Sequence, residues 1–273
     1  MRTILSALLL IVTILWWPDH SDAQKLDVPY VPTPPSVVDR MLDLANLGPG
    51  DYLIDLGSGD GRIVIEAGLR GAAGHGVDLD RNLVEASREK AAVAEVSDRV
   101  MFLREDIYET EIRQASVITL YLLTRINLKL RPRLLEELRP GTRVISHSFH
   151  MGEWTPDSTL SVTTPSNAEH KIYLWIIPAR AEGRWRWKTD RVQHNLSIRQ
   201  KFQKITPDLR TGKGFFTVSD AVLQGRRISF RAEERPGGNY RYSGRIQGNR
   251  IWGFVQIRQN GEQRVEKWTA RRK

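Results

Sequence analysis

Short apolar runs alternate with helical patterns through the first half of the chain, and this order constrains the fold most. Strands are predicted at residues 52–56, 74–78, 100–103, 117–122 and 143–146, and helices are predicted to begin at residues 61, 81 and 127. Parallel strands joined by right-handed crossovers account for this order. The sequence therefore predicts an α/β fold with a doubly wound, Rossmann-like sheet, which a hairpin of residues 160–163 and 171–177 completes to seven strands.

The charge of the chain is divided unevenly between two regions. Residues 181–273 carry 22 Lys and Arg against 8 Asp and Glu, whereas the other 180 residues carry 19 against 24. The overall net charge of +9 is therefore the sum of a mildly acidic main region and a strongly basic C-terminal third. Cysteine is absent from the sequence, which excludes disulfide frameworks, thiolate metal clusters and cysteine nucleophiles.

The C-terminal third alternates apolar and polar residues strictly. Turn signals such as Gln224-Gly225, Gly248-Asn249 and Asn260-Gly261 divide it into about seven predicted strands. A meander of this size closes most easily as a small antiparallel β-barrel or sandwich. We therefore expect three parts, with residues 1–23 as an N-terminal segment, residues 24–180 as the α/β domain and residues 181–273 as an appended basic β-domain.

Arginine fills many of the outward positions predicted for this β-domain, which gives it a cationic face. One interpretation is a docking surface for an anionic envelope surface, an acidic protein or nucleic acid, and the alternative is a solvated face without a ligand. Nucleic acid is disfavoured because Trp185 and Trp187 fall on the apolar side of their strand, where they cannot stack on bases.

The N-terminus has the three parts of a secretory signal peptide. A short basic start is followed by 14 almost wholly apolar residues, 4–17, and by a polar stretch with Ser21 and Ala23 at cleavage positions. An uncleaved anchor is the alternative, although a spanning helix needs about 20 apolar residues. Either interpretation predicts an exported protein that is periplasmic or membrane-associated through this segment.

A glycine-rich loop follows the first predicted strand, where ligands of such sheets bind. It comprises Asp55, Leu56, Gly57, Ser58, Gly59, Asp60 and Gly61. The dinucleotide fingerprint would require glycine at position 62, where this chain has Arg62, so a nicotinamide-dependent oxidoreductase is disfavoured. The charge of Asp55 would repel a pyrophosphate but attract the ammonium group of a ligand.

Two further acids follow the next strands. Asp78 ends the second strand about 20 residues after the loop, where an acid can accept hydrogen bonds from both ribose hydroxyls. Asp80 is better explained as the N-cap of the next helix. Asp106 follows the third strand and can accept from the exocyclic amine of an adenine, or can serve as a turn acid. Together, the loop and these acids point to a nucleoside that carries an amino acid.

At these residues the sequence resembles the class I S-adenosylmethionine-dependent methyltransferases, over about residues 29–178. Residues 29–34 (Pro-Tyr-Val-Pro-Thr-Pro), the Asp55 loop and residues 119–123 are more narrowly similar to the mitochondrial lysine methyltransferases of the ATP synthase c subunit and the adenine nucleotide translocase, and to their bacterial relatives. A looser likeness runs to the nucleosomal histone-lysine methyltransferases that lack a SET domain. The resemblance implies a seven-stranded methyltransferase sheet and methylation of a protein lysine. It also implies that S-adenosylmethionine is bound by Asp55, Gly57, Ser58, Gly59, Gly61, Asp78 and Asp106.

The segment after the fourth strand is Leu120-Tyr121-Leu122-Leu123. Many amino-methylating enzymes of this fold have Asn/Asp-Pro-Pro-Tyr there, so adenine- and glutamine-methylating relatives are disfavoured. Tyr121 becomes the substrate-side candidate, with a core aromatic as the alternative. His147 and His150 end the fifth strand as candidates for the substrate mouth, but their spacing is poor for a metal site and favours structural histidines.

The resemblance implies in-line attack of a nucleophile on the methyl group of a sulfonium. Desolvation beside the sulfonium would help a lysine to lose its proton, so no single acid or base is expected to be indispensable. The leading hypothesis is accordingly a protein-lysine methyltransferase. The alternative is an exported binding protein that keeps the methyltransferase fold without activity, because fold alone does not fix function.

Overall fold

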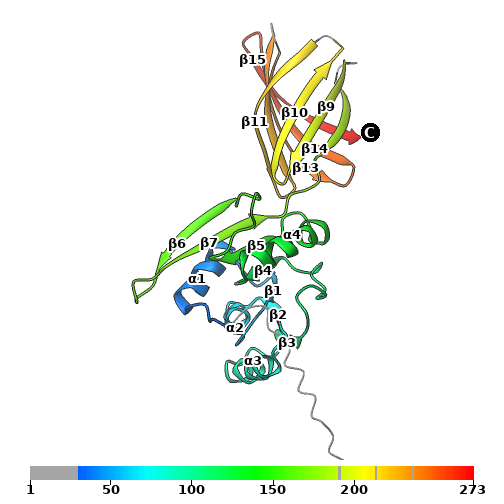
Figure 1. The fold of residues 1–273 in the computed structure, drawn as a ribbon. Coiled ribbons are helices and arrows are strands. Elements are labelled where there is room, and N and C mark those ends of the chain that lie inside the picture. Colours follow the sequence, from blue (N-terminus) through cyan, green and yellow to red (C-terminus); the bar gives the residue numbers. More distant parts are fainter. Residues whose placement is uncertain (1–29, 190–191, 213, 235–236) are drawn as a thin grey trace, which may run out of the picture.

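The computed structural model describes residues 30–189, 192–212, 214–234 and 237–273. These residues form a mixed seven-stranded sheet with helices and a closed antiparallel barrel (Figure 1). The predicted signal peptide, residues 1–23, lies outside the described residues. Within the described part of the chain, no helix has the length and apolarity needed to cross a bilayer.

The seven-stranded sheet has the order β3-β2-β1-β4-β5-β7-β6. Its strands are β1 Tyr52–Leu56, β2 Ala73–Asp78, β3 Val100–Arg104, β4 Val117–Leu120, β5 Arg143–His147, β6 Ser158–Thr163 and β7 Glu169–Ile176. The first five strands are parallel, and β7 runs antiparallel between β5 and β6. The predicted α/β sheet is therefore confirmed, with the second strand of the hairpin, rather than the first, joining β5.

Four helices cover the two faces of this sheet. They are α1 Pro35–Leu44, α2 Arg62–Leu69, α3 Arg81–Val93 and α4 Thr124–Glu137. Apolar side chains of α1, α2 and α3 form one core cluster with one face of the sheet, and those of α4 form a second cluster with the other face. Helix α4 begins at Thr124, three residues before the predicted start. Asn127 lies in its first turn and is buried, and its amide donates to the Ser146 hydroxyl and the Phe149 carbonyl.

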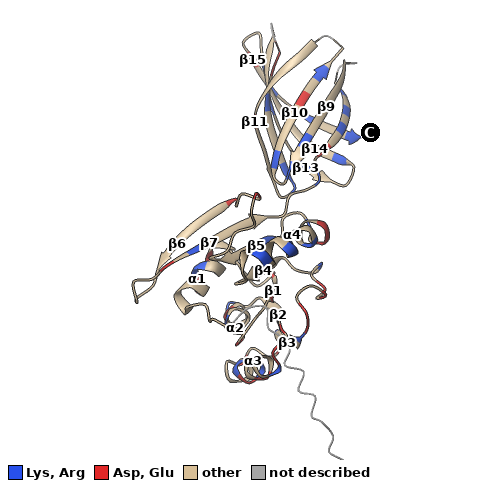
Figure 2. Cartoon of the chain, in the orientation of Figure 1, with Lys and Arg blue, Asp and Glu red and all other residues tan. Residues whose placement is uncertain are grey.

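The C-terminal strands form a closed barrel of antiparallel strands. They are β8 Gly183–Thr189, β9 Val192–Lys201, β10 Lys204–Thr211, β11 Gly214–Gln224, β12 Arg227–Glu234, β13 Gly238–Gln247, β14 Arg250–Gln259 and β15 Glu262–Arg272. Their inward side chains, among them Trp185 and Trp187, form a separate core, as the alternation predicted. Lys and Arg lie along many of these strands, and Asp and Glu are fewer there (Figure 2).

Strand β10 was not among the approximately seven strands predicted from the sequence. It contains Pro207, and proline is unfavourable within a strand. Strand β10 pairs along its length with β9, but the described register with β11 comprises only Arg210 and Thr211. Pro207 lies opposite Ile198 of β9 and has no N–H group to donate. The side of β10 that faces β11 has few described pairs, so the missing donor is tolerated there.

The barrel contacts the sheet domain through turns at one of its ends. The Ala179 amide donates to the Gly225 carbonyl at 2.7 Å, and the Phe202 ring stacks on Trp154 with 5.8 Å between ring centroids. Trp154 is fully buried, as expected for a core residue. Figure 1 accordingly shows the barrel on the side of the sheet domain where β5, β7 and α4 lie. The glycine loop follows β1, in the part of the sheet formed by β1, β2 and β3.

Candidate functional site

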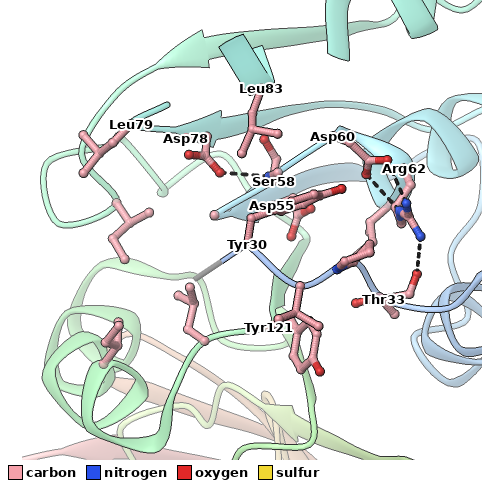
Figure 3. A pocket seen from close by; sticks show the side chains of 18 of the residues that line it. Tyr30, Thr33, Asp55, Ser58, Asp60, Arg62, Asp78, Leu79, Leu83 and Tyr121 are labelled. Carbon is pink, nitrogen blue, oxygen red and sulfur yellow. Dashed lines mark hydrogen bonds and ion pairs between the residues drawn. The ribbon is translucent and has the colours of Figure 1, made fainter. Parts of the chain in front are cut away.

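A pocket of about 250 Å³ opens at the carboxyl ends of β1, β2 and β4 (Figure 3). Its polar lining brings together all the acids that the sequence singled out for a ligand: Asp55, Asp78 and Asp106. Gly57, Ser58 and Gly59 line it as well, and so does Tyr121. Apolar walls come from side chains after β2, β3 and β4, including Leu79, Leu83, Ile107 and Leu122. The predicted residues thus converge on one cavity, except Gly61, which lies behind it.

The glycine loop needs its glycines for backbone conformation and for space. Gly57, Gly59 and Gly61 have positive φ angles of 85°, 52° and 79°. A Cβ atom at Gly61 would lie 2.7 Å from the Phe102 ring, so this glycine lets the start of α2 pack closely against β3. Gly59 and Gly57 instead leave room at the pocket itself, because a Cβ on either would collide with Tyr30 or Leu122.

Asp78 is held in place by backbone donors. One carboxylate oxygen accepts from the Gly59 amide at 2.9 Å, and the other accepts from the Asp80 amide at 3.0 Å. Asp80 caps α3 by accepting from the Asn82 amide, as predicted. Each oxygen of Asp78 keeps further acceptor capacity, so the carboxylate is fixed beside the loop and can still accept from a ligand.

Asp55 is 2% exposed and accepts a hydrogen bond from the Thr119 hydroxyl at 2.7 Å. Burial, together with the charges of Asp78 and Asp60, raises the pKa of Asp55 to about 7, against the lowering effect of the Thr119 hydrogen bond. Among the residues that the structure describes, no cationic side chain pairs with the Asp55 carboxylate. A positively charged ligand group in the pocket would stabilise that ionised form.

Asp106 is a turn acid that also lines the pocket. One of its carboxylate oxygens accepts from the Tyr108 amide at 2.8 Å, and its carbonyl accepts from the Thr110 hydroxyl, as in a turn acid. The residue also lines the pocket between Leu79 and Ile107. The turn fixes the carboxylate, whose second oxygen remains for a ligand donor.

The sequence analysis missed a polar strap across the pocket entrance. Arg62 donates to both oxygens of Asp60 and to the Thr33 carbonyl, and Lys90 donates to Asp60 at 2.6 Å. The contacts of Arg62, drawn in Figure 3, hold the segment that starts at Tyr30 against the glycine loop. The Tyr30 ring packs against Gly59. From the sequence, Arg62 was informative only because it replaces the glycine of the dinucleotide fingerprint. Its contact with Thr33 could not be predicted, because the two residues are distant in the sequence.

Tyr121, the candidate for the substrate side, lines the pocket opposite the loop (Figure 3). Its ring stacks on His147 at 3.9 Å between centroids, and burial raises its pKa. His147 is behind it, hydrogen-bonded to Thr33 and His170. Burial and the charge of His170 lower the pKa of His147 to about 4, so His147 is neutral near pH 7.

His150 does not join this group. It is exposed, and its Nδ1 atom accepts from the Gly152 amide. Among the described residues, no group of His, Cys, Asp and Glu side chains is arranged to hold a metal ion. Of the two histidines considered as candidates for the substrate mouth, His147 packs behind Tyr121 and His150 lies in a surface turn.

Known proteins resemble the sheet domain. The family model of the ANTKMT methyltransferase domain matches residues 55–158. A protein-lysine N-methyltransferase of Saccharolobus islandicus is 41% identical over 55% of this chain and 94% of its own length. The adenine nucleotide translocase lysine N-methyltransferase of Mus musculus is 36% identical, and the lysine N-methyltransferase of the ATP synthase c subunit from Homo sapiens is 32% identical. The matches cover 58% and 57% of these two mammalian chains.

Among solved structures, an RNA methyltransferase of Salinibacter ruber in complex with S-adenosyl-L-homocysteine is 50% identical, with a TM-score of 0.52. The similarity covers 55% of this chain and 95% of that one. The matched 55% of this chain is about the length of the sheet domain, which contains the pocket.

Proposed function

The chain belongs to the family of S-adenosylmethionine-dependent protein-lysine methyltransferases, and on that premise we propose that it methylates the side-chain amine of a lysine in a protein. The convergence of Asp55, Asp78 and Asp106 on one pocket beside the glycine loop is the observation that carries this proposal. The relatives named above are methyltransferases, which gives no support to an inactive binding protein of the same fold.

The chemistry of the pocket fits S-adenosylmethionine. The ligand carries an ammonium and a sulfonium, and the pocket offers the buried Asp55 carboxylate, which lacks a protein cation. The ligand also carries a ribose and an adenine, for which Asp78, Asp106 and the apolar walls are available. When bound, the cofactor supplies an activated methyl group.

We assign roles to the protein residues accordingly. Asp55 pairs with the ammonium group, Asp78 accepts from the ribose hydroxyls, and Asp106 accepts from the adenine amine. Gly57, Ser58 and Gly59 allow the ligand close to the backbone. Tyr30 covers the loop, and Tyr121 with Phe149 forms the wall nearest the acceptor.

The acceptor lysine must be neutral before it attacks. Deprotonation from a pKa near 10.4 costs about 4.6 kcal/mol at pH 7. Apolar walls and a neighbouring sulfonium both disfavour the ammonium form of the lysine, so they lower its pKa. The amine nitrogen then bonds to the methyl carbon while the carbon–sulfur bond breaks and its electron pair stays on sulfur. Alignment of these atoms by the pocket supplies much of the rate.

The test has two stages. Calorimetry of the full chain with S-adenosylmethionine should show binding, and binding should be lost in Asp55→Ala and Asp78→Ala. Radiolabelled cofactor, incubated with protein and RNA fractions of a cell extract, should then label a protein, and mass spectrometry should locate the methyl group on lysine. Labelling of RNA alone would overturn the lysine proposal while leaving the methyltransferase assignment intact.

We also propose that residues 1–23 direct the chain out of the cytoplasm, on the basis of their signal-peptide pattern. A fusion of this segment to a reporter that is active only after export should be active. An inactive fusion, with the chain recovered in the cytoplasmic fraction, would contradict the proposal.

A further inference from the structure

One wall of the barrel exposes large hydrophobic side chains. Trp252, Phe254 and Val265 lie on the neighbouring strands β14 and β15, and Val222 lies on β11 in the row of Phe254, beyond β13 and β12. Val222, Trp252, Phe254 and Val265 are 55%, 47%, 50% and 59% exposed. Trp252 and Phe254 are two residues apart on β14 and share its outer face, and Val265 lies on the neighbouring β15 opposite Gln256. Exposed hydrophobic side chains scattered singly need no explanation, but a cluster on neighbouring strands indicates an interaction site.

Basic side chains flank this cluster on the same wall. The strand register places Arg245 directly opposite Trp252 and Lys267 directly opposite Phe254. Arg227 continues the row of Arg245, and Arg231 faces Arg241 in the row of Gln256. We call these five basic residues and the four hydrophobic residues the basic–aromatic face.

Within the described rows of the face, Arg227, Arg241, Arg245 and Lys267 have no acidic neighbour, and Arg231 alone is compensated. The other outward residues in these rows of β11–β15 are Ser, Thr and Gln. Asp220, at the bulge beside the face, is paired with Arg231 at 3.0 Å. The face is therefore complementary to an extended anionic surface.

We propose that the basic–aromatic face docks the protein on a phospholipid bilayer with anionic head groups. Arg and Lys would contact the head groups, each strengthening binding about fivefold. Trp252 and Phe254 would insert at the boundary between head groups and acyl chains, where such side chains are favoured. Val222 and Val265 favour a bilayer over a nucleic acid as the partner. Transfer of an aliphatic side chain from water to lipid is favourable, whereas such a side chain has no ring on which a base can stack.

The cysteine-free sequence allows a direct test on the full chain. Ser243 is exposed between Phe254 and Ser229 in the middle of the face, and Thr206 is exposed on β10, across the barrel. Ser243→Cys and Thr206→Cys each accept one environment-sensitive dye. With vesicles that contain phosphatidylglycerol, we expect a blue shift and loss of acrylamide quenching at position 243 and neither at position 206. Vesicles of phosphatidylcholine alone should have little effect.

Two matched double variants then test the charge contribution. In the Ser243→Cys background, Arg245→Gln with Lys267→Gln should require about thirtyfold more anionic vesicle for the same shift. Arg199→Gln with Lys204→Gln, on the β9–β10 wall, removes the same charge and should leave the shift unchanged. Equal response at positions 243 and 206 would overturn the proposal. So would protection of position 243 by single-stranded RNA without protection by vesicles, since it would assign the face to nucleic acid.

Discussion

Asp55→Asn should make the unliganded protein more stable above pH 7 and remove its affinity for the cofactor. The substitution keeps the shape of the side chain and an oxygen that can accept from the Thr119 hydroxyl, and it removes the buried negative charge. The same carboxylate that costs stability in the empty pocket is the partner proposed for the ligand ammonium. Stability and binding should therefore change in opposite directions.

The magnitude follows from the raised pKa of Asp55. A pKa of about 7 in the folded protein, against an ordinary 3.8, corresponds to at most about 4 kcal/mol of unfolding free energy. Between these two pH values the folded protein holds a proton that the unfolded chain has released, so stability falls as pH rises. The advantage of Asp55→Asn should thus be near zero at pH 4, grow toward pH 7 and level off above it.

Denaturant unfolding of both proteins between pH 4 and pH 8.5 measures this difference. Thr119→Val provides a contrast, because it keeps the carboxyl but removes the hydroxyl that donates to it; the pKa of Asp55 should rise further, and the loss of stability should continue to higher pH. Calorimetry of the wild type at pH 6 should also show proton release on cofactor binding. A stability difference that does not vary with pH would refute the reasoning, and so would unchanged cofactor affinity in Asp55→Asn.

Three further predictions concern single residues. Gly61→Ala should lower the free energy of unfolding by on the order of 2 kcal/mol, measured by denaturant unfolding, because its φ of 79° and the nearby Phe102 ring oppose a Cβ. Asp78→Asn should weaken cofactor binding roughly 10- to 100-fold in calorimetry, because the amide cannot accept at both positions; unchanged affinity would place the ribose elsewhere. His147→Asn should flatten the stability profile between pH 6.5 and pH 4. Because the pKa of His147 is lowered in the folded protein, the unfolded chain takes up the proton first as the pH falls, and the stability of the wild type decreases toward pH 4. An unchanged slope in the variant would show that His147 is not the cause of this decrease.

Local sequence patterns were sufficient to predict the sheet and the positions of the ligand acids. Most strands of the sheet domain are short runs rich in apolar residues, and Asp55, Asp78 and Asp106 lie at or just after the carboxyl ends of strands that meet at one edge. The strap of Tyr30, Thr33 and Arg62 could not be predicted this way. It depends on side-chain contacts between the glycine loop and a proline-rich segment about 30 residues earlier, and neither segment has a pattern that specifies the other.

The barrel shows a second limit, the direction in which a side chain points. Trp185 and Trp187 are correctly predicted inside, and their position was the reason for disfavouring nucleic acid as a ligand of the β-domain. That reason does not extend to Trp252 and Phe254, which alternate with the buried Ile251 and Val255 and point outward. Gly253 separates them on the inner face, where a Cβ would meet the Ser243 carbonyl at 2.0 Å. Alternation gives the two faces of a strand, but the packing of its neighbours decides which face is buried.

The glycine loop also shows why an acid near a ligand site need not bind the ligand. Asp55 and Asp60 flank the same loop and line the same pocket. Although burial alone would raise the pKa of Asp60, hydrogen bonds from Arg62 and Lys90 lower it well below its ordinary value, so its charge is already neutralised by the protein. Asp55 has a hydroxyl donor but no such cation, and its pKa is raised to about 7. A cationic ligand therefore gains far more from Asp55 than from Asp60. Asp60 holds the pocket cover as part of the strap, which leaves Asp55 as the carboxylate that we propose for the ammonium group of the ligand.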